Sequence, residues 1–163
     1  MKAPLPPPRD RADRVALALG VWFGCGLVPL APGTAGTIGA IPLYLALRSH
    51  GLVAVALGAV VVTIVGVWAS GRVAARTGLH DPQIVCIDEV AGVLVTWLGA
   101  PPGVAGLVAG FVVFRVLDQW KPWPARWAER SLPPAWGIMF DDVFAGAWGA
   151  VALLASRAAG LWG

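Results

Sequence analysis

Residues 52–70 read LVAVALGAVVVTIVGVWAS, an uninterrupted apolar run of 19 residues. A helix of roughly 20 apolar residues crosses the hydrocarbon core of a bilayer, so this run has nearly the length of a membrane span. Its many β-branched residues could also indicate a buried strand, but strands are usually only about 4–8 residues long. The run therefore predicts a long helix and favours an all-α fold.

The composition of the chain indicates a membrane protein. Hydrophobic residues make up 58% of the 163 residues, and the mean hydropathy is +0.74, whereas soluble domains are about 45–50% apolar. Nine tryptophans suggest anchoring where hydrocarbon meets lipid headgroups. The alternative is a very apolar soluble helical domain. The net charge of +3 comes from basic residues that flank apolar runs, which favours an anionic membrane over nucleic acid as a partner.

Shorter apolar segments predict further helices, which cover residues 38–47, 90–100, 104–114 and 143–155. Turns at 48–51 and 101–103 would join them into two helical hairpins. Segments 38–47 and 90–100 are too short to cross a bilayer, which predicts shallow or tilted helices. We expect a compact multi-helix membrane-associated bundle, with helical hairpins and with polar loops that converge on one face.

The start of the chain predicts a tail followed by one domain. Residues 1–14 are rich in proline and mixed in charge, and they lack a signal-peptide pattern. We expect a disordered tail over 1–14 and a single helical membrane domain over 15–163. Segment 15–30 is broken by glycine and proline, so a re-entrant or interfacial helix is preferred there to a full crossing. Two cysteines in apolar surroundings give no disulfide framework.

Acidic residues gather in three short polar segments between the apolar runs. Six of the nine acids in the chain lie there: Asp81, Asp88, Glu89, Asp118, Asp141 and Asp142. Ionisable groups near a bilayer are costly, so they usually mark a functional site. In the expected hairpins the turns at 48–51 and 101–103 lie at one end of the bundle. All three polar segments then lie at the other end, and we predict that they form one site.

Arg115, Asp118 and Lys121 follow one another at intervals of three residues. Each interval of three residues turns through about 300° on a helix, so the three side chains fan across one broad face over two turns. A structural salt-bridge ladder is one interpretation of this spacing. In the functional interpretation Asp118 binds a metal ion. Arg115 then contacts phosphate oxygens with bidentate geometry, and Lys121 does so as a mobile point charge.

Two pairs of neighbouring acids favour a bound cation. Asp88 and Glu89 precede an apolar segment, and Asp141 and Asp142 are interpreted as the start of the last helix. Helix capping could explain acids in a first turn, but two carboxylates exceed what a cap needs, and Mg²⁺ would offset their repulsion. The candidate metal ligands are Asp88, Glu89, Asp118, Asp141 and Asp142. The candidate catalytic residues are Asp88, Glu89, Asp118, Asp142, Arg115 and Lys121.

Residues 31–37 read APGTAGT, and we expect a loop ahead of a helix. Glycine allows the backbone to approach a phosphate closely, and hydroxyl groups can donate hydrogen bonds to it. The Gly-Lys-Ser/Thr ending of a Walker loop is absent. The candidate phosphate-binding residues are Thr34, Gly36 and Thr37, together with Arg115 and Lys121.

Basic residues are distributed unevenly between the two ends of the expected bundle. The end with the polar segments carries Arg72, Arg76, Arg115, Lys121, Arg126 and Arg130. The other end carries only Arg48 and Arg157. Because cytoplasmic loops are enriched in Lys and Arg, we predict that the site faces the cytoplasm.

Four blocks together resemble the phosphatidylglycerophosphatase A family of bacterial membrane lipid phosphatases. They are PGTAGT at 32–37, HDPQIVCIDE at 80–89, FRVLDQWKPWP at 114–124 and GIMFDD at 137–142. They occur in the order and spacing of the family over roughly residues 20–150, and the block at 114–124 is the most specific. Ile87 stands where some members have an aromatic residue, an exchange of one apolar side chain for another.

The resemblance implies an all-helical fold and Mg²⁺-dependent hydrolysis of phosphatidylglycerol phosphate to phosphatidylglycerol and phosphate. This reaction belongs to phospholipid biosynthesis and leads on to cardiolipin. The implied partners are the phospholipid substrate and the membrane, and the implied location is the cytoplasmic (inner) membrane.

Two other classes of protein fit parts of the pattern. A small membrane ion or metabolite transporter would use the carboxylates for a coupling cation, but its acids would be expected at helix breaks in the middle of the bilayer. A structural membrane subunit would not need five acids near cations. The sequence leaves open which carboxylates bind metal, which is the general base, how many ions bind, how broad the lipid specificity is, and the oligomeric state.

Overall fold

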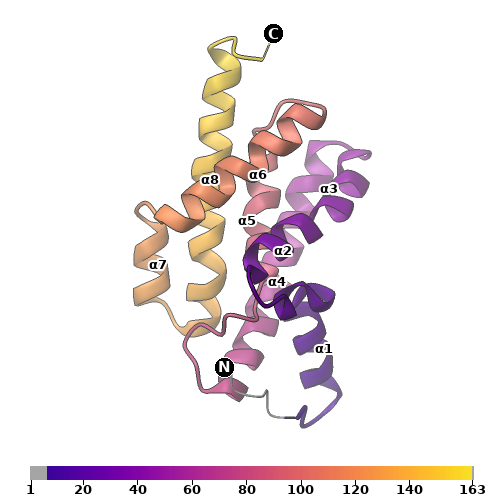
Figure 1. The fold of residues 1–163 in the computed structure, drawn as a ribbon, viewed down its shortest axis with the longest axis vertical. Coiled ribbons are helices and arrows are strands. Elements are labelled where there is room, and N and C mark those ends of the chain that lie inside the picture. The colour runs from indigo at the N-terminus through magenta and orange to yellow at the C-terminus, as the bar shows by residue number, and fades with distance from the viewer. Residues whose placement is uncertain (1–6, 163) are drawn as a thin grey trace.

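The structure, a computed structural model, describes residues 7–162, and every regular element in that range is a helix. Three helices form the centre: α4 (Leu52–Thr77), α5 (Ile87–Trp97) and α8 (Pro134–Ala158). Helix α5 packs against both long helices, and its most extensive contact is with α8. Figure 1 shows α8 running along the long axis of the molecule. The predicted all-α bundle is confirmed.

The remaining elements surround this centre. They are α1 (Arg11–Gly20), the 3₁₀-helix η1 (Trp22–Leu27), α2 (Pro32–Gly39), α3 (Ile41–Arg48), α6 (Val104–Trp120) and α7 (Ala125–Ser131). Helices α1 and α3 pack on α4, α2 packs on η1 and α5, and α6 and α7 pack on α8. The α3–α4 and α5–α6 connections lie towards the same end of the molecule (Figure 1), as the hairpin prediction requires.

Helix α5 is enclosed on nearly every side. Its side chains Val90, Val93, Leu94 and Trp97 are all fully buried. A helix that is apolar all round its circumference belongs in the interior. Phe114 of α6 is among the fully buried side chains of the same core. The structure thus places α5 in the interior of the bundle.

Glycine lets α5 and α8 touch backbone to backbone. A Cβ atom on Gly146 would lie 2.2 Å from the carbonyl oxygen of Gly92, and a Cβ on Gly92 would lie 2.6 Å from the carbonyl oxygen of Asp142. Real Cβ atoms essentially never come this close to another atom, so any larger residue would force the helices apart. Small residues allow such close crossings in membrane proteins. The crossing also sets how near the acids of α5 and α8 can come.

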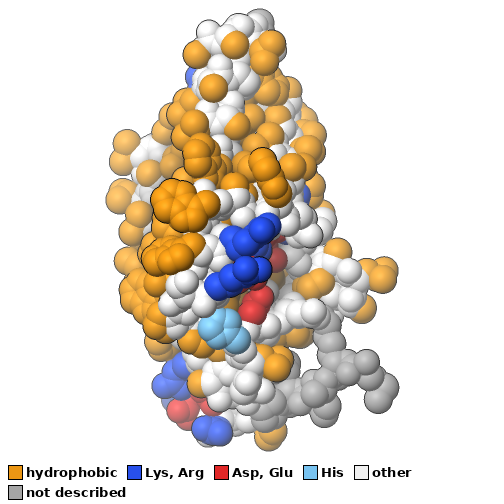
Figure 2. Space-filling model, turned by 90° about the vertical axis from the view of Figure 1, so that its left-hand side faces the viewer, with side chains coloured by type: hydrophobic (Ala, Val, Ile, Leu, Met, Phe, Trp, Pro, Cys, Tyr) orange, Lys and Arg blue, Asp and Glu red, His pale blue; other side chains and the backbone are white. Residues whose placement is uncertain are grey.

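Two helices are long and apolar enough to cross a membrane, α4 and α8. Only 28% of the apolar window of α4 is buried, and its outward face exposes Val53, Leu57, Val60, Val61 and Ile64. Helix α6 adds an exposed valine stripe at positions 104, 108, 112 and 116. On the side of the molecule that Figure 2 shows, hydrophobic side chains also cover much of the surface. Apolar surface on this scale is typical of contact with lipid, so the fold is a membrane-associated helical bundle.

Several expected boundaries were wrong for local reasons. Residues 32–37, expected as a loop, belong to α2, because Pro32 suits the first turn of a helix. Asp141 and Asp142 do not start a helix but lie within α8, which begins at Pro134. The polar stretch 125–131 forms the separate helix α7. The expected helix 38–47 is divided between α2 and α3 at Ala40.

The N-terminal prediction also needs correction. Residues 1–6 lie outside the described range, but α1 begins at Arg11, within the expected disordered tail. Asp10 caps this helix, because its Oδ1 accepts a hydrogen bond from the backbone N–H of Asp13 at 2.7 Å. Segment 15–30 forms no continuous helix. Phe23 and Gly24, at φ 53° and 106°, kink η1, which excludes a simple crossing.

Asp13 fastens α1 to α4. Its Oδ1 accepts a hydrogen bond from Arg72 Nη1 at 2.8 Å, and its Oδ2 lies 3.6 Å from Arg76 Nε. The pKa of Asp13 is lowered, first by the hydrogen bond from the backbone N–H of Arg9 and then by the two arginines, while burial acts in the opposite direction. The ionised carboxylate therefore stabilises this contact.

We predict that Asp13→Asn lowers the thermal midpoint of the protein in detergent at pH 7. Because the folded-state pKa lies below the unfolded value, the contribution is present above about pH 4 and is lost as the pH falls through the folded pKa. The difference between variant and wild type should therefore shrink as the pH falls towards 3. Asp10→Asn, which keeps a good N-cap and loses only the longer 3.5 Å ion pair with Arg72, is the comparison variant and should have a smaller effect. A difference that is constant with pH would contradict the assignment.

Candidate active site

The polar segments meet in one cavity of about 510 Å³ at the starts of α2 and α5, the end of α6 and the middle of α8. Two cationic side chains line it, Arg115 and Lys121. Six carboxyl side chains line it as well: Asp81, Asp88, Glu89, Asp118, Asp141 and Asp142. Formally the acids exceed the cations by four. The predicted convergence is therefore present, with a strong excess of negative charge.

Three of these carboxylates could share one metal ion. Ligand atoms of Asp88, Glu89 and Asp142 all lie within 4.8 Å of one another. Two buried oxygens in this group, Asp88 Oδ1 and Glu89 Oε2, have no hydrogen-bond partner among the described residues. Buried polar atoms normally have partners, and carboxylate oxygens are the ligands that Mg²⁺ prefers. The donor set therefore fits a divalent cation.

Asp88 and Glu89, the two acids in the first turn of α5, both have raised pKa values. Burial raises the pKa of Asp88 well above its usual range, and the neighbouring Glu89 carboxylate adds to the shift. Burial also raises the pKa of Glu89 to about 8. In the absence of a cation, desolvation and like-charge repulsion favour protonation. A bound divalent ion would reverse that preference.

Asp118 is held by a neighbour on its own helix. Its Oδ2 lies 2.7 Å from Arg115 Nη1, one turn earlier on α6, and accepts a hydrogen bond from Gln119 Nε2 at 3.3 Å. Asp118 is 7% exposed. The i, i+3 spacing that suggested a shared face thus produces a direct ion pair. This pair holds the Arg115 guanidinium at the cavity wall.

Lys121 is held by two acids from other elements. Its Nζ lies 2.5 Å from Asp141 Oδ2 and 3.0 Å from Glu129 Oε1. Although burial lowers the pKa of Lys121, the nearby Asp141 carboxylate raises it overall, with Glu129 contributing, so the ammonium group stays charged. Lys121 also ends α6 in a left-handed conformation, at φ 49°. Non-glycine residues rarely adopt this conformation, and here it turns the chain at the cavity.

The candidate phosphate-binding residues of α2 are not brought to the cavity. Thr37 is buried, and its hydroxyl donates to the carbonyl oxygen of Gly33 at 2.8 Å. Gly36 packs against Cys86. Among the described residues the cavity lining includes positions 31–33 but neither Thr34, Gly36 nor Thr37. The helical conformation turns these three residues away from the position that a loop would have given them.

The structure adds residues that the sequence did not single out for the site. Gln83 and Gln119 line the cavity, and Glu129 reaches Lys121 from α7. Gln119 could have been found from its place beside Asp118. Glu129 carried no such signal, because its role depends on α7 folding back towards the end of α6.

Gly33 allows α2 to approach Glu89 closely. A Cβ atom at this position would lie 2.1 Å from Glu89 Oε1 and 3.1 Å from Arg115 Nη1. Any side chain would therefore displace the carboxylate. Gly33 thus helps to define where the Glu89 carboxylate sits relative to Asp88 and Asp142.

We predict that Gly33→Ala weakens Mn²⁺ binding about tenfold, because it displaces one of three candidate ligands. Titration with Mn²⁺ followed by electron paramagnetic resonance would measure the affinity. Gly20→Ala is the matched control, because its Cβ would meet only Val73 Cγ2 at 3.4 Å, an ordinary contact. Equal Mn²⁺ affinity in the two variants, both folded, would show that Glu89 does not contribute.

Comparisons with known proteins identify the family of this chain. The sequence profile of the family described as Phosphatidylglycerophosphatase A matches residues 18–157. Phosphatidylglycerophosphatase A of Escherichia coli (strain K12) is 38% identical over 129 residues, covering 78% of this chain and 75% of the relative. The Haemophilus influenzae protein of the same name is 32% identical over 140 residues, covering 84% and 85%.

A third relative has a different provisional name. A Bacteroides thetaiotaomicron protein, named provisionally as a phosphatidylinositol-3-phosphatase, is 33% identical over 155 residues, covering 90% of this chain and 96% of the relative. No solved structure matches the chain. The family match spans the whole acidic cavity. The chain belongs to the phosphatidylglycerophosphatase A family and is a phosphoric monoester hydrolase.

Proposed function

We propose that the protein is a Mg²⁺-dependent phosphatidylglycerophosphatase, which hydrolyses phosphatidylglycerol phosphate to phosphatidylglycerol and phosphate in phospholipid biosynthesis. The observation that carries the proposal is the grouping of Asp88, Glu89 and Asp142 beside Arg115 and Lys121 in one cavity. Carboxylates that suit a hard cation thus lie next to cations that suit a phosphate. Family membership supports hydrolysis and not the transporter alternative.

Asp88, Glu89 and Asp142 would hold the Mg²⁺ ion. Bound there, the ion would neutralise negative charge on the phosphoryl oxygens. The three residues come from the start of α5 and the middle of α8, which the Gly92–Gly146 crossing holds together. The chain therefore supplies a rigid set of ligands.

Arg115 and Lys121 would bind and orient the phosphate. A guanidinium forms paired hydrogen bonds with phosphate oxygens, and an ammonium adds a point charge. Asp118 fixes the direction of Arg115, and Asp141 together with Glu129 fixes Lys121. Donors held in place before the reaction stabilise the charge that develops on the phosphoryl group.

We assign to Asp81, by elimination among the lining acids, the role of accepting the proton of the attacking water. Of the lining acids, Asp118 and Asp141 pair with cations, while Asp88, Glu89 and Asp142 form the candidate metal group. Asp81 remains, and its side chain is exposed to the cavity mouth. A carboxylate that is not committed to another charge can take up a proton during the reaction.

The lipid would reach the cavity without leaving the bilayer. The valine stripe of α6 and the outward face of α4 would lie against acyl chains, while the headgroup enters the polar cavity. The basic residues near that cavity favour a position at the cytoplasmic face of the inner membrane. Figure 2 shows a compact group of basic and acidic side chains below a broad hydrophobic surface, with a second charged group at the lower left.

We predict that the purified protein releases phosphate from phosphatidylglycerol phosphate in detergent micelles only when Mg²⁺ is present. Asp142→Asn should reduce kcat/KM about 100-fold, since it removes a metal ligand. Arg115→Lys should have an effect of similar size because it keeps the charge but loses the paired hydrogen bonds. A phosphate-release assay with and without a chelator measures both effects.

Asp10→Asn and Arg14→Lys are the matched controls, because Asp10 and Arg14 are exposed residues near the N-terminus and outside the cavity. Near wild-type turnover of Asp142→Asn would remove that residue from the metal site. Full activity after exhaustive chelation would contradict a role for Mg²⁺. Absence of phosphate release by the wild-type protein would contradict the proposed substrate.

A further inference from the structure

A second groove, of about 530 Å³, lies beside the active-site cavity along the end of α6 and α7. Its wall combines aromatic and basic side chains: Trp120, Trp123, Trp127, Arg126 and Arg130. The three tryptophans are 66%, 76% and 49% exposed. Exposed tryptophan is typical of the membrane–water interface. The proposed hydrolysis assigns no role to this groove.

The two arginines of the groove have no acidic partner among the described residues. Arg126 Nη2 donates to the backbone carbonyl of Trp120 at 2.9 Å, and Arg130 forms no ion pair within residues 7–162. Glu129, which lies between them in the sequence, instead pairs with Lys121. Like charges at i and i+4 destabilise a helix. An anion bound between the two guanidinium groups would relieve this repulsion.

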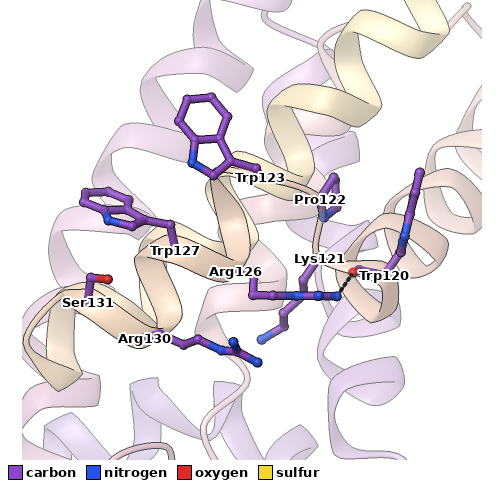
Figure 3. Close-up of a pocket in the computed structure, with 8 residues that line it drawn as sticks. All are labelled: Trp120, Lys121, Pro122, Trp123, Arg126, Trp127, Arg130 and Ser131. Carbon is purple, nitrogen blue, oxygen red and sulfur yellow. Dashed lines mark hydrogen bonds between the residues drawn. The ribbon is translucent and has the colours of Figure 1, made fainter.

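Lys121 connects the groove to the active site, because its side chain lines both. In Figure 3, Arg126 and Arg130 extend from α7 towards the side on which Lys121 lies, while Trp123 and Trp127 extend the other way. A ligand whose reacting phosphate lies at Lys121 could therefore place a second anionic group next to the two arginines. The two phosphate-binding positions would be neighbours.

An apolar surface joins the same region. A shallow groove on α6 is lined mainly by Phe111, Val112, Val116 and Trp120. It shares Arg115 and Gln119 with the active-site cavity, and Trp120 with the groove along α6 and α7. Acyl chains suit the apolar surface. The active-site cavity thus suits a reacting phosphate, the groove along α6 and α7 suits a second anion, and the shallow groove on α6 suits hydrocarbon chains.

We propose that the α6–α7 groove binds the non-reacting phosphodiester of the lipid substrate, with Arg126 and Arg130 as its specificity-determining residues. The proposal rests on the proposed function, and it defines the substrate class as a lipid that carries a phosphodiester and a terminal phosphomonoester on one headgroup. A lipid whose monoester is attached directly to diacylglycerol has no group for this groove. Discrimination then comes from hydrogen bonds that only the first lipid can form.

The test compares Arg126→Gln/Arg130→Gln with wild type on phosphatidylglycerol phosphate and on phosphatidate, in micelles of a neutral detergent. We expect kcat/KM for phosphatidylglycerol phosphate to fall about tenfold or more, and kcat/KM for phosphatidate to stay within about twofold. Arg14→Gln/Arg157→Gln changes the net charge equally at two exposed positions outside the groove. It should leave both substrates unaffected.

A binding measurement keeps the inference testable when phosphatidate turns over slowly. Phosphatidylglycerol carries the phosphodiester without the monoester, so the double glutamine variant should bind it about tenfold more weakly in the same micelles. Equal loss on both substrates would assign the arginines to general attraction to lipid surfaces. The proposal would be overturned if kcat/KM fell equally for phosphatidylglycerol phosphate and phosphatidate, or if the variant bound phosphatidylglycerol as well as wild type does. Loss of wild-type phosphatidylglycerol phosphate hydrolysis would instead contradict the proposed function, whatever the binding result.

Discussion

Burying several carboxylates of like charge inside an apolar helical bundle is the constraint on which the rest of this structure depends. Two unit charges separated by 4.8 Å, the span of the Asp88, Glu89 and Asp142 ligand atoms, repel by roughly 3 kcal/mol at an effective dielectric of 20. Six acids and two cations line the cavity, so side chains alone leave it strongly negative. Two ion pairs, Asp118 with Arg115 and Asp141 with Lys121, offset part of this negative charge. Asp88 and Glu89 on α5 retain unpartnered buried oxygens and have raised pKa values. Together with Asp142 they have the chemical character of a divalent-cation site.

The fold places these charges together by bringing backbones unusually close. Gly92 and Gly146 let α5 and α8 touch, and Gly33 lets α2 approach Glu89. None of these glycines carries chemistry, but each sets a distance between groups that do. Helix α5 is too short to span a bilayer. It begins at the cavity, and its first turn carries Asp88 and Glu89. The long helices α4 and α8 are apolar enough to cross a membrane, and α4 exposes an apolar face. The candidate site and this apolar surface therefore arise from the same packing.

Much of this arrangement could be predicted from the sequence, because the spacing of apolar and acidic residues is a strong signal. The run at 52–70 predicted α4, and the turns at 48–51 and 101–103 predicted that the polar segments would share one end. The errors in the predicted helix boundaries arose where a proline started a helix earlier than the pattern of apolar and polar residues indicated. Pro32 starts a helix where glycine and hydroxyl residues suggested a loop, which keeps Thr34, Gly36 and Thr37 out of the cavity lining. Asp141 and Asp142 lie inside α8 because the helix already begins at Pro134. The division of the acids into ion-paired residues and a metal-binding group could not be predicted, since it depends on how α5, α6 and α8 pack.

The central claim is that Asp88, Glu89 and Asp142 hold one divalent cation next to Arg115 and Lys121. The most direct measurement is an anomalous-scattering map from crystals of the wild-type protein grown with Mn²⁺ in place of Mg²⁺. The account predicts an anomalous peak within coordination distance of all three carboxylates, about 2.0–2.3 Å from each ligating oxygen. A map with the only strong peak at another group of acids, or with none in the cavity at saturating Mn²⁺, would contradict it.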